Sequence, residues 1–263
     1  MRTVLLLLCG LASFIGVSAA ALAGVEDITT PRGATVRMLV ETGDNPFAVV
    51  VLFAGGPGVL DISEDGGIGK LAGNFLVASR QHFQKAGAIT AVIDAPSDRR
   101  NHLHGFRDSQ AHADDVAAVV KHLRAKYKLP VWLVGTSRGT ESVANAGARL
   151  TGDGKPAGIV LTASITVPHR KFPYHVLTSE LERIAGPVLI AHHRQDACEH
   201  CPPGNVETIR KRLTNAAPVK VLWYDGGEGT KGDPCEANHY HGFVGIRQPV
   251  VRDIMAWIRS PSG

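Results

Sequence analysis

Short apolar runs that alternate with amphipathic helical segments constrain the fold of this 263-residue chain more than any other feature. Residues 47–53 and 88–93 are apolar and β-branched almost throughout, which is typical of strands buried on both faces. Further strands are expected at residues 35–41, 131–134, 157–163, 187–191 and 219–224, and helices at 74–86, 109–126, 141–150, 206–213 and 248–258. This alternation predicts an α/β fold with a mostly parallel central sheet and helices on both faces.

The first residues of the chain have the pattern of a cleaved export signal. Arg2 supplies a positive start, residues 4–17 are almost wholly apolar, and the Ala-Leu-Ala at 21–23 matches a small-residue cleavage site. A membrane anchor and a lipoprotein signal ending at Cys9 are the alternatives, but the apolar run is short for either. We therefore expect a signal peptide over residues 1–23 and a secreted or periplasmic protein.

The composition is that of an ordinary globular protein. Hydrophobic residues make up 44% of the chain and charged residues 20%, which excludes an intrinsically disordered chain. The formal net charge of +4 is spread along the sequence without a basic stripe, so no nucleic-acid partner is expected. No other segment is long and apolar enough to cross a bilayer. We expect one α/β domain over residues 24–263, with no membrane span in the mature chain.

The strongest chemical signal is Gly135-Thr136-Ser137-Arg138-Gly139, which follows a predicted strand and precedes a predicted helix. A G-x-S-x-G sequence in this context indicates a nucleophile elbow, in which the chain turns sharply and holds the serine in a strained conformation. The flanking glycines leave room for the turn. A plain turn with a solvated serine is the alternative. The motif predicts that Ser137 is a nucleophile at the positive end of the following helix.

Three motifs in a fixed order resemble those of the α/β-hydrolase superfamily over nearly the whole mature chain. They are Phe53-Ala54-Gly55-Gly56-Pro57-Gly58 after an early strand, the elbow at Ser137, and His241-Gly242-Phe243 near the end. The resemblance implies the α/β-hydrolase fold and a serine hydrolase that works through an acyl-enzyme intermediate. The only irregular insertion of any size, residues 164–181, is short, so any lid over the site is expected to be minimal.

A serine hydroxyl needs a base to take its proton, and the base needs an acid to orient it. In the superfamily the chain order is serine, acid, histidine. His241 matches the terminal histidine loop, with His239 as the alternative base. Asp196 follows the predicted strand 187–191, where the family usually places the acid. Glu199 and Asp225 are the alternative acids.

Acyl transfer also requires hydrogen-bond donors for the negative oxygen of the intermediate. One donor is expected to be the backbone N–H of Arg138, directly after the nucleophile. The resemblance assigns the other to Gly56, with Gly55 next, because Pro57 has no N–H. Ala54 stands where many lipases and peptidases carry histidine, which weakens any match to proline iminopeptidases.

Three of the four cysteines lie outside the predicted signal: Cys198, Cys201 and Cys235. A bridge between Cys198 and Cys235 would tie the acid loop to the histidine loop, and Cys201 is the alternative partner of Cys235. A Cys198–Cys201 bridge has no thioredoxin-like context to support it. Histidines surround these cysteines, but the spacing fits no standard zinc pattern, so no metal is expected.

The sequence therefore predicts an enzyme that hydrolyses a carboxylic ester of a small-molecule acyl substrate with no cofactor. Amide or peptide hydrolysis and acyl transfer to an alcohol would use the same residues. A non-catalytic binding protein on the same fold is the alternative from another class, because a fold does not dictate a function.

Overall fold

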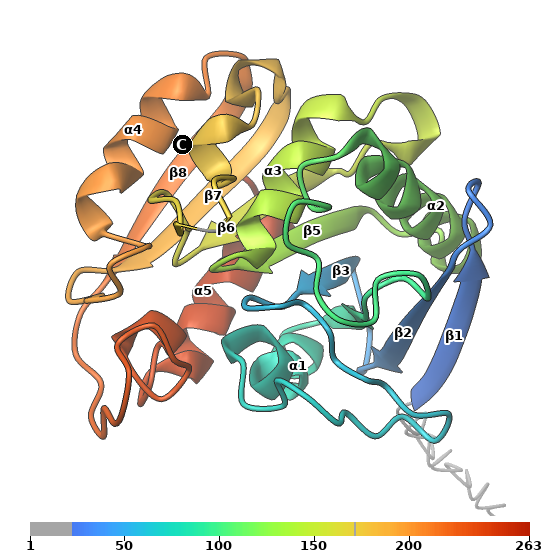
Figure 1. Cartoon of the computed structure of the whole chain (residues 1–263), viewed down its shortest axis with the longest axis horizontal. Coiled ribbons are helices and arrows are strands. Elements are labelled where there is room, and N and C mark those ends of the chain that lie inside the picture. The colour runs from blue at the N-terminus through green and yellow to red at the C-terminus, as the bar shows by residue number, and fades with distance from the viewer. Residues whose placement is uncertain (1–22, 171) are drawn as a thin grey trace, which may run out of the picture.

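The structure is a computed structural model, and it describes residues 23–170 and 172–263. Within these residues the chain forms one eight-stranded sheet in the order β1-β2-β4-β3-β5-β6-β7-β8 (Figure 1). The strands are β1 (Ala23–Thr29), β2 (Thr35–Thr42), β3 (Ala48–Phe53), β4 (Ala88–Ile93), β5 (Val131–Thr136), β6 (Gly158–Thr162), β7 (Gly186–His193) and β8 (Ala216–Tyr224). Strands β3 to β8 run parallel, whereas β1 and β2 are antiparallel.

Helices cover both faces of the sheet (Figure 1). The helices are α1 (Phe75–Lys85), α2 (Gln110–Tyr127), α3 (Gly139–Arg149), α4 (Val206–Arg212) and α5 (Arg247–Arg259). Buried residues of α2, α3 and α4 pack in one apolar cluster with Val49 and Val51 of β3. Those of α1 and α5 pack in a second cluster with Val50 and Leu52. Successive residues of β3 thus face opposite cores, which is why this strand is apolar throughout.

The predicted α/β class, with a mostly parallel sheet and helices on both faces, is confirmed. Strand β1 was not predicted, because it is an edge strand whose residues are exposed or half-buried and so form no apolar run. The proposed signal over residues 1–23 lies outside the described residues except for Ala23, which opens β1. Among the described residues no helix is long and apolar enough to cross a membrane.

Two glycines allow β5, α3 and the end of β3 to meet closely at the elbow. A Cβ on Gly139 would lie 2.0 Å from the backbone oxygen of Phe53, and one on Gly135 would lie 2.5 Å from the oxygen of Gly139. These contacts are with backbone atoms, so no side chain can move aside to make room. The glycines of the motif therefore fix the distance between the serine and the loop after β3.

The substitution Gly139→Ala is expected to lower the free energy of unfolding by about 1–3 kcal/mol, the usual cost of overpacking a close contact. Urea denaturation monitored by circular dichroism measures the change. The control is Gly204→Ala, where a Cβ meets no atom within 4 Å. Equal stability of the two variants would contradict this account of the elbow.

Candidate active site

The first component of the site is Ser137, which stands between β5 and α3 as the elbow motif requires. Its φ of +52° lies in the left-handed region, which non-glycine residues rarely adopt. The turn is held by backbone hydrogen bonds, in which the N–H of Ser137 donates to the Thr162 oxygen of β6 and the N–H of Thr140 donates to the Ser137 oxygen. The strain and its support are the features expected of a nucleophile elbow.

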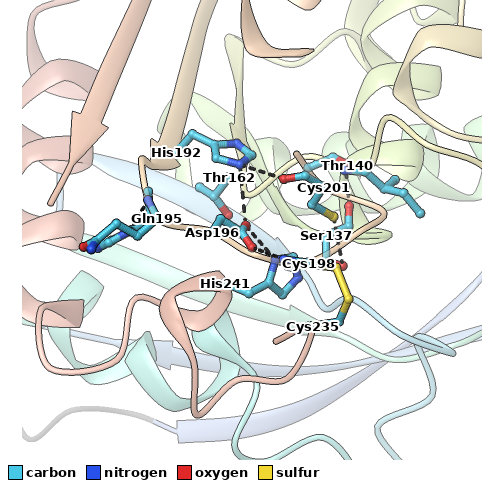
Figure 2. A network of polar contacts seen from close by, with 12 residues as sticks. Ser137, Thr140, Thr162, His192, Gln195, Asp196, Cys198, Cys201, Cys235 and His241 are labelled. Carbon is cyan, nitrogen blue, oxygen red and sulfur yellow. Dashed lines mark hydrogen bonds and ion pairs between the residues drawn. A yellow bond between two sulfur atoms is a disulfide. The ribbon is translucent and has the colours of Figure 1, made fainter. Parts of the chain in front are cut away.

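The second component is a buried carboxylate–imidazole pair. Asp196 lies three residues after the end of β7, and His241 lies in the 3₁₀ helix Tyr240–Gly242. The Nδ1 of His241 is 2.8 Å from Oδ2 of Asp196 (Figure 2). The Nε2 atom of His241 is buried and has no hydrogen-bond partner among the described residues. A proton on Nδ1 is therefore shared with Asp196, and Nε2 is left as an acceptor.

Asp196 is held as a carboxylate by its neighbours. Burial alone would raise its pKa, but hydrogen bonds from His192 and His241 outweigh burial and lower the pKa to about 2. The N–H of Cys198 also donates to Oδ1 at 3.0 Å. The carboxylate is thus ionised at neutral pH and can stabilise a positive charge on the imidazole.

Ser137 and His241 border the same cavity but are not hydrogen-bonded to each other among the described contacts. The cavity has a volume of about 280 Å³. The polar contact recorded for the hydroxyl of Ser137 is the Sγ atom of Cys201, at 4.0 Å. Burial raises the pKa of the Cys201 thiol, which keeps it protonated and a poor nucleophile. Catalytic hydrogen bonds are often long in a site without substrate and shorten only in the complex.

The loop after β3 lies against the serine. A Cβ on Gly55 would be 2.9 Å from Cβ of Ser137, and Gly56 has a φ of +55°. The N–H groups of Gly56 and Arg138 donate to no other group among residues 23–170 and 172–263. Gly56 lines the same cavity as Ser137, and Arg138 directly follows the serine in the chain.

Arg107, which sequence reasoning missed, fastens this loop to the elbow. Its guanidinium is fully buried, and it donates to the Ala54 oxygen at 2.9 Å and to Oγ of Ser142 in α3 at 2.8 Å. Burial lowers the pKa of Arg107 to about 10, which still leaves it charged at neutral pH. No motif marks this residue in the sequence, because its partners are a backbone oxygen and a serine far along the chain. His192, at the end of β7, lies 3.5 Å from the carboxylate of Asp196, and no motif marks it either.

Both alternative acids are exposed, whereas Asp196 is buried. Asp225 is exposed and pairs with Arg194 at 3.2 Å, and Glu199 is exposed beside His200. His239 is only half-buried, and its Nδ1 atom has no recorded partner within the described chain. The structure thus places Ser137 and His241 on one cavity, with Asp196 hydrogen-bonded to His241.

A disulfide joins Cys198 to Cys235, as predicted. It connects the loop that carries Asp196 to the loop that carries His241, at positions two residues after the acid and six before the histidine. Cys201 is buried and free, so neither alternative pairing is present. The covalent link limits how far the acid and histidine loops can separate.

Comparisons with known proteins rest on structure alone, since no protein-family model and no curated protein matches the sequence. An esterase from Pyrococcus furiosus superposes with a TM-score of 0.65 at 13% identity, over 91% of each chain. A dienelactone hydrolase from Anabaena variabilis gives 0.64 at 12% identity, over 92% of this chain and 98% of the other. The chain has the α/β-hydrolase fold.

A third α/β-hydrolase neighbour bears on the expected lid. A serine hydrolase from Xanthomonas campestris, described as having no lid, gives a TM-score of 0.58 at 15% identity over 92% of this chain and 96% of the other. Between β6 and β7 the only helices that the described residues form are the single-turn 3₁₀ helices Val176–Thr178 and Leu181–Arg183. The expectation of a minimal lid is confirmed.

The depressed pKa of Asp196 predicts a pH-dependent contribution to stability. The folded-state pKa of about 2 lies below the ordinary value of 3.8, so the contribution is complete above about pH 4 and is lost as the pH falls toward 2. The variant Asp196→Asn has no ionisable carboxyl group at this position and therefore lacks this contribution to stability. The stability advantage of the wild type over this variant is expected to shrink from roughly 2 kcal/mol near pH 6 to near zero at pH 2.

Urea denaturation at a series of pH values measures this difference. Asp225→Asn serves as the control, because an exposed surface substitution should change stability by no more than about 0.5 kcal/mol at any pH. A stability gap between wild type and Asp196→Asn that did not depend on pH would contradict the assignment.

Proposed function

We propose that the chain is a serine hydrolase that cleaves a carboxylic ester through Ser137, His241 and Asp196. The observation that carries the proposal is the 2.8 Å hydrogen bond between Asp196 and His241, which leaves Nε2 of the imidazole unpaired beside the cavity that Ser137 also borders. A buried imidazole fixed at one nitrogen and free at the other is suited to accept a proton from a hydroxyl.

The reaction begins when substrate brings Oγ of Ser137 and Nε2 of His241 to about 2.6–3.2 Å. Oγ attacks the ester carbonyl while Nε2 takes its proton, and Asp196 stabilises the imidazolium that forms. The negative oxygen is held by the N–H groups of Arg138 and Gly56. His241 then protonates the departing alcohol, and water repeats the sequence to release the acid. No cofactor takes part in these steps.

The cavity supports a small acyl substrate with polar groups. Its volume of about 280 Å³ lies just below the range of about 300–1,000 Å³ for small-molecule sites. Polar side chains in its lining are Asn74, Glu236 and Asn238, together with Thr136 beside the serine. A long alkyl chain would not fit within a cavity of this volume, so short esters are the proposed substrates.

We further infer that the protein acts outside the cytoplasm, after removal of residues 1–23. The disulfide supports this inference, because structural disulfides persist in oxidising compartments such as the periplasm.

The substitution Ser137→Ala is expected to lower kcat for p-nitrophenyl acetate by about 10³- to 10⁶-fold, because it removes the nucleophile and leaves only binding and oxyanion stabilisation. The control is Ser260→Ala, since Ser260 is exposed at the end of α5. A fluorophosphonate probe should label the wild type once, at Ser137. Labelling of another residue, or full activity in Ser137→Ala, would refute the proposal.

A series of p-nitrophenyl esters of increasing chain length, run beside aminoacyl anilides, tests the substrate class. Acetate and butyrate esters are expected to have the highest kcat/KM, because longer chains do not fit the cavity. Faster anilide cleavage would point to an amidase on the same residues. No turnover and no labelling would favour the non-catalytic alternative.

A further inference from the structure

Three sulfur atoms, which take no part in the proposed reaction, gather at the active site around a ring nitrogen of His241. We call Cys198, Cys201, Cys235 and His241 the sulfur–imidazole cluster. The sulfurs of Cys198 and Cys201 and a ring nitrogen of His241 all lie within 4.8 Å of one another, and all three residues are buried. The sulfur of Cys235 is bonded to that of Cys198. Three sulfur atoms and one imidazole nitrogen, all of them potential metal ligands, therefore converge from the acid loop and the histidine loop (Figure 2).

The imidazole is already oriented as a metal ligand would be. Its Nδ1 is hydrogen-bonded to Asp196 at 2.8 Å, and the buried Nε2 atom has no partner within the described chain. Metal-binding histidines in proteins almost always give their second ring N–H to a carboxylate or carbonyl in this way, which fixes the tautomer and strengthens the ligand.

The disulfide withholds two of the four ligands, because a metal binds the thiolate and not the disulfide sulfur. A dithiol reductant would supply two electrons and two protons, cleave the Cys198–Cys235 bond to two thiols and itself become a disulfide. The chain would then present three thiols and Nε2 of His241. A tetrahedral zinc site with Zn–S bonds of about 2.3 Å places its sulfurs about 3.8 Å apart. That separation lies within the 4.8 Å limit for the sulfurs of Cys198 and Cys201 and the ring nitrogen of His241. The sulfur of Cys235 would move away from that of Cys198 once their bond is cleaved.

We propose that reduction of the Cys198–Cys235 disulfide converts the sulfur–imidazole cluster into a site for one thiophilic divalent cation, Zn²⁺, with three cysteine ligands and His241. On binding, the three thiols lose three protons, and three Zn–S bonds and one Zn–N bond form. The expectation from sequence that no metal binds then applies only to the oxidised chain.

A reductant and an ion can reach the cluster through Cys235. This residue is half-buried and borders the active-site cavity. It also borders a second hollow, which is lined by Ala197, Glu199, His200, Asp233 and Pro234. The acidic side chains at this second opening would attract a cation.

Metal capture would also remove the proposed general base. Nε2 of His241 cannot bind the ion and take a proton from Ser137 at the same time, so the metal-loaded chain is expected to lose ester hydrolysis. This consequence rests on the proposed function, whereas metal binding itself does not.

The test compares the mature chain in two redox states. One sample stays oxidised, and the other is reduced with dithiothreitol and desalted without oxygen. Each is titrated with Co²⁺ as a spectroscopic substitute for Zn²⁺, and bound zinc is then counted by elemental analysis. The reduced chain should bind one ion and develop the thiolate charge-transfer and strong visible bands of tetrahedral cobalt. The oxidised chain should show neither.

Variants identify the ligands. Loss of an outer-shell partner weakens metal binding about 10–100-fold, so loss of a ligand in Cys201→Ala or His241→Ala should weaken it by more than about 100-fold. The matched control is His239→Ala, because His239 is a neighbouring histidine outside the cluster. It should bind cobalt as the unmodified chain does. Far-UV circular dichroism measures whether the reduced chain is folded before and after metal is added. A chain that is folded throughout and a chain that folds on binding the metal both agree with the proposed site.

Failure to bind cobalt in the reduced state would overturn the proposal. Equal binding by Cys201→Ala, or binding by a chain that stays unfolded with the metal, would also overturn it. Stoichiometric binding with unchanged ester hydrolysis would leave the metal site standing and would contradict the role of His241 as base. The failures of the two proposals are therefore distinguishable.

Discussion

The hydrogen bond between Asp196 and His241 is the interaction on which the candidate site depends. It fixes the tautomer of the imidazole, keeps the carboxylate ionised in a buried place, and leaves Nε2 as the one unpaired nitrogen of the ring. Removal of either partner would leave a buried polar group without a hydrogen-bond partner, which lowers the free energy of unfolding. His192 adds a second imidazole to the same carboxylate, at 3.5 Å.

The fold brings this pair to the serine through several independent constraints. Parallel strands bring Ser137 and Asp196 to the same edge of the sheet, after β5 and β7. Close backbone contacts at the glycines of the elbow fix the serine against the loop after β3, and Arg107 ties that loop to α3. The disulfide connects the two loops that carry the acid and the histidine. The acid loop also carries the third sulfur of the cluster, that of Cys201.

Local sequence pattern predicted most of the sheet, because apolar β-branched runs are diagnostic when a strand is buried on both faces. Strand β1 was not predicted, because an exposed edge strand does not require an apolar, β-branched run. The elbow serine could be predicted because its motif specifies it. The Cys198–Cys235 bridge was favoured because it ties the acid loop to the histidine loop, but the sequence left Cys201 as an alternative partner of Cys235. Arg107 could not, because its role comes from contacts with Ala54 and Ser142, which are remote in sequence. The missing hydrogen bond between Ser137 and His241 likewise depends on side-chain placement that no pattern encodes.

A crystal structure of the chain after reaction with a small alkyl phosphonate tests the central claim most directly. The account predicts a bond from phosphorus to Oγ of Ser137, with Nε2 of His241 within about 3.2 Å of a phosphonate oxygen or of Oγ. It also predicts that the phosphoryl oxygen accepts hydrogen bonds from the N–H groups of Arg138 and Gly56. An adduct on another residue, or an imidazole turned away from Asp196 and the phosphonate, would contradict the account.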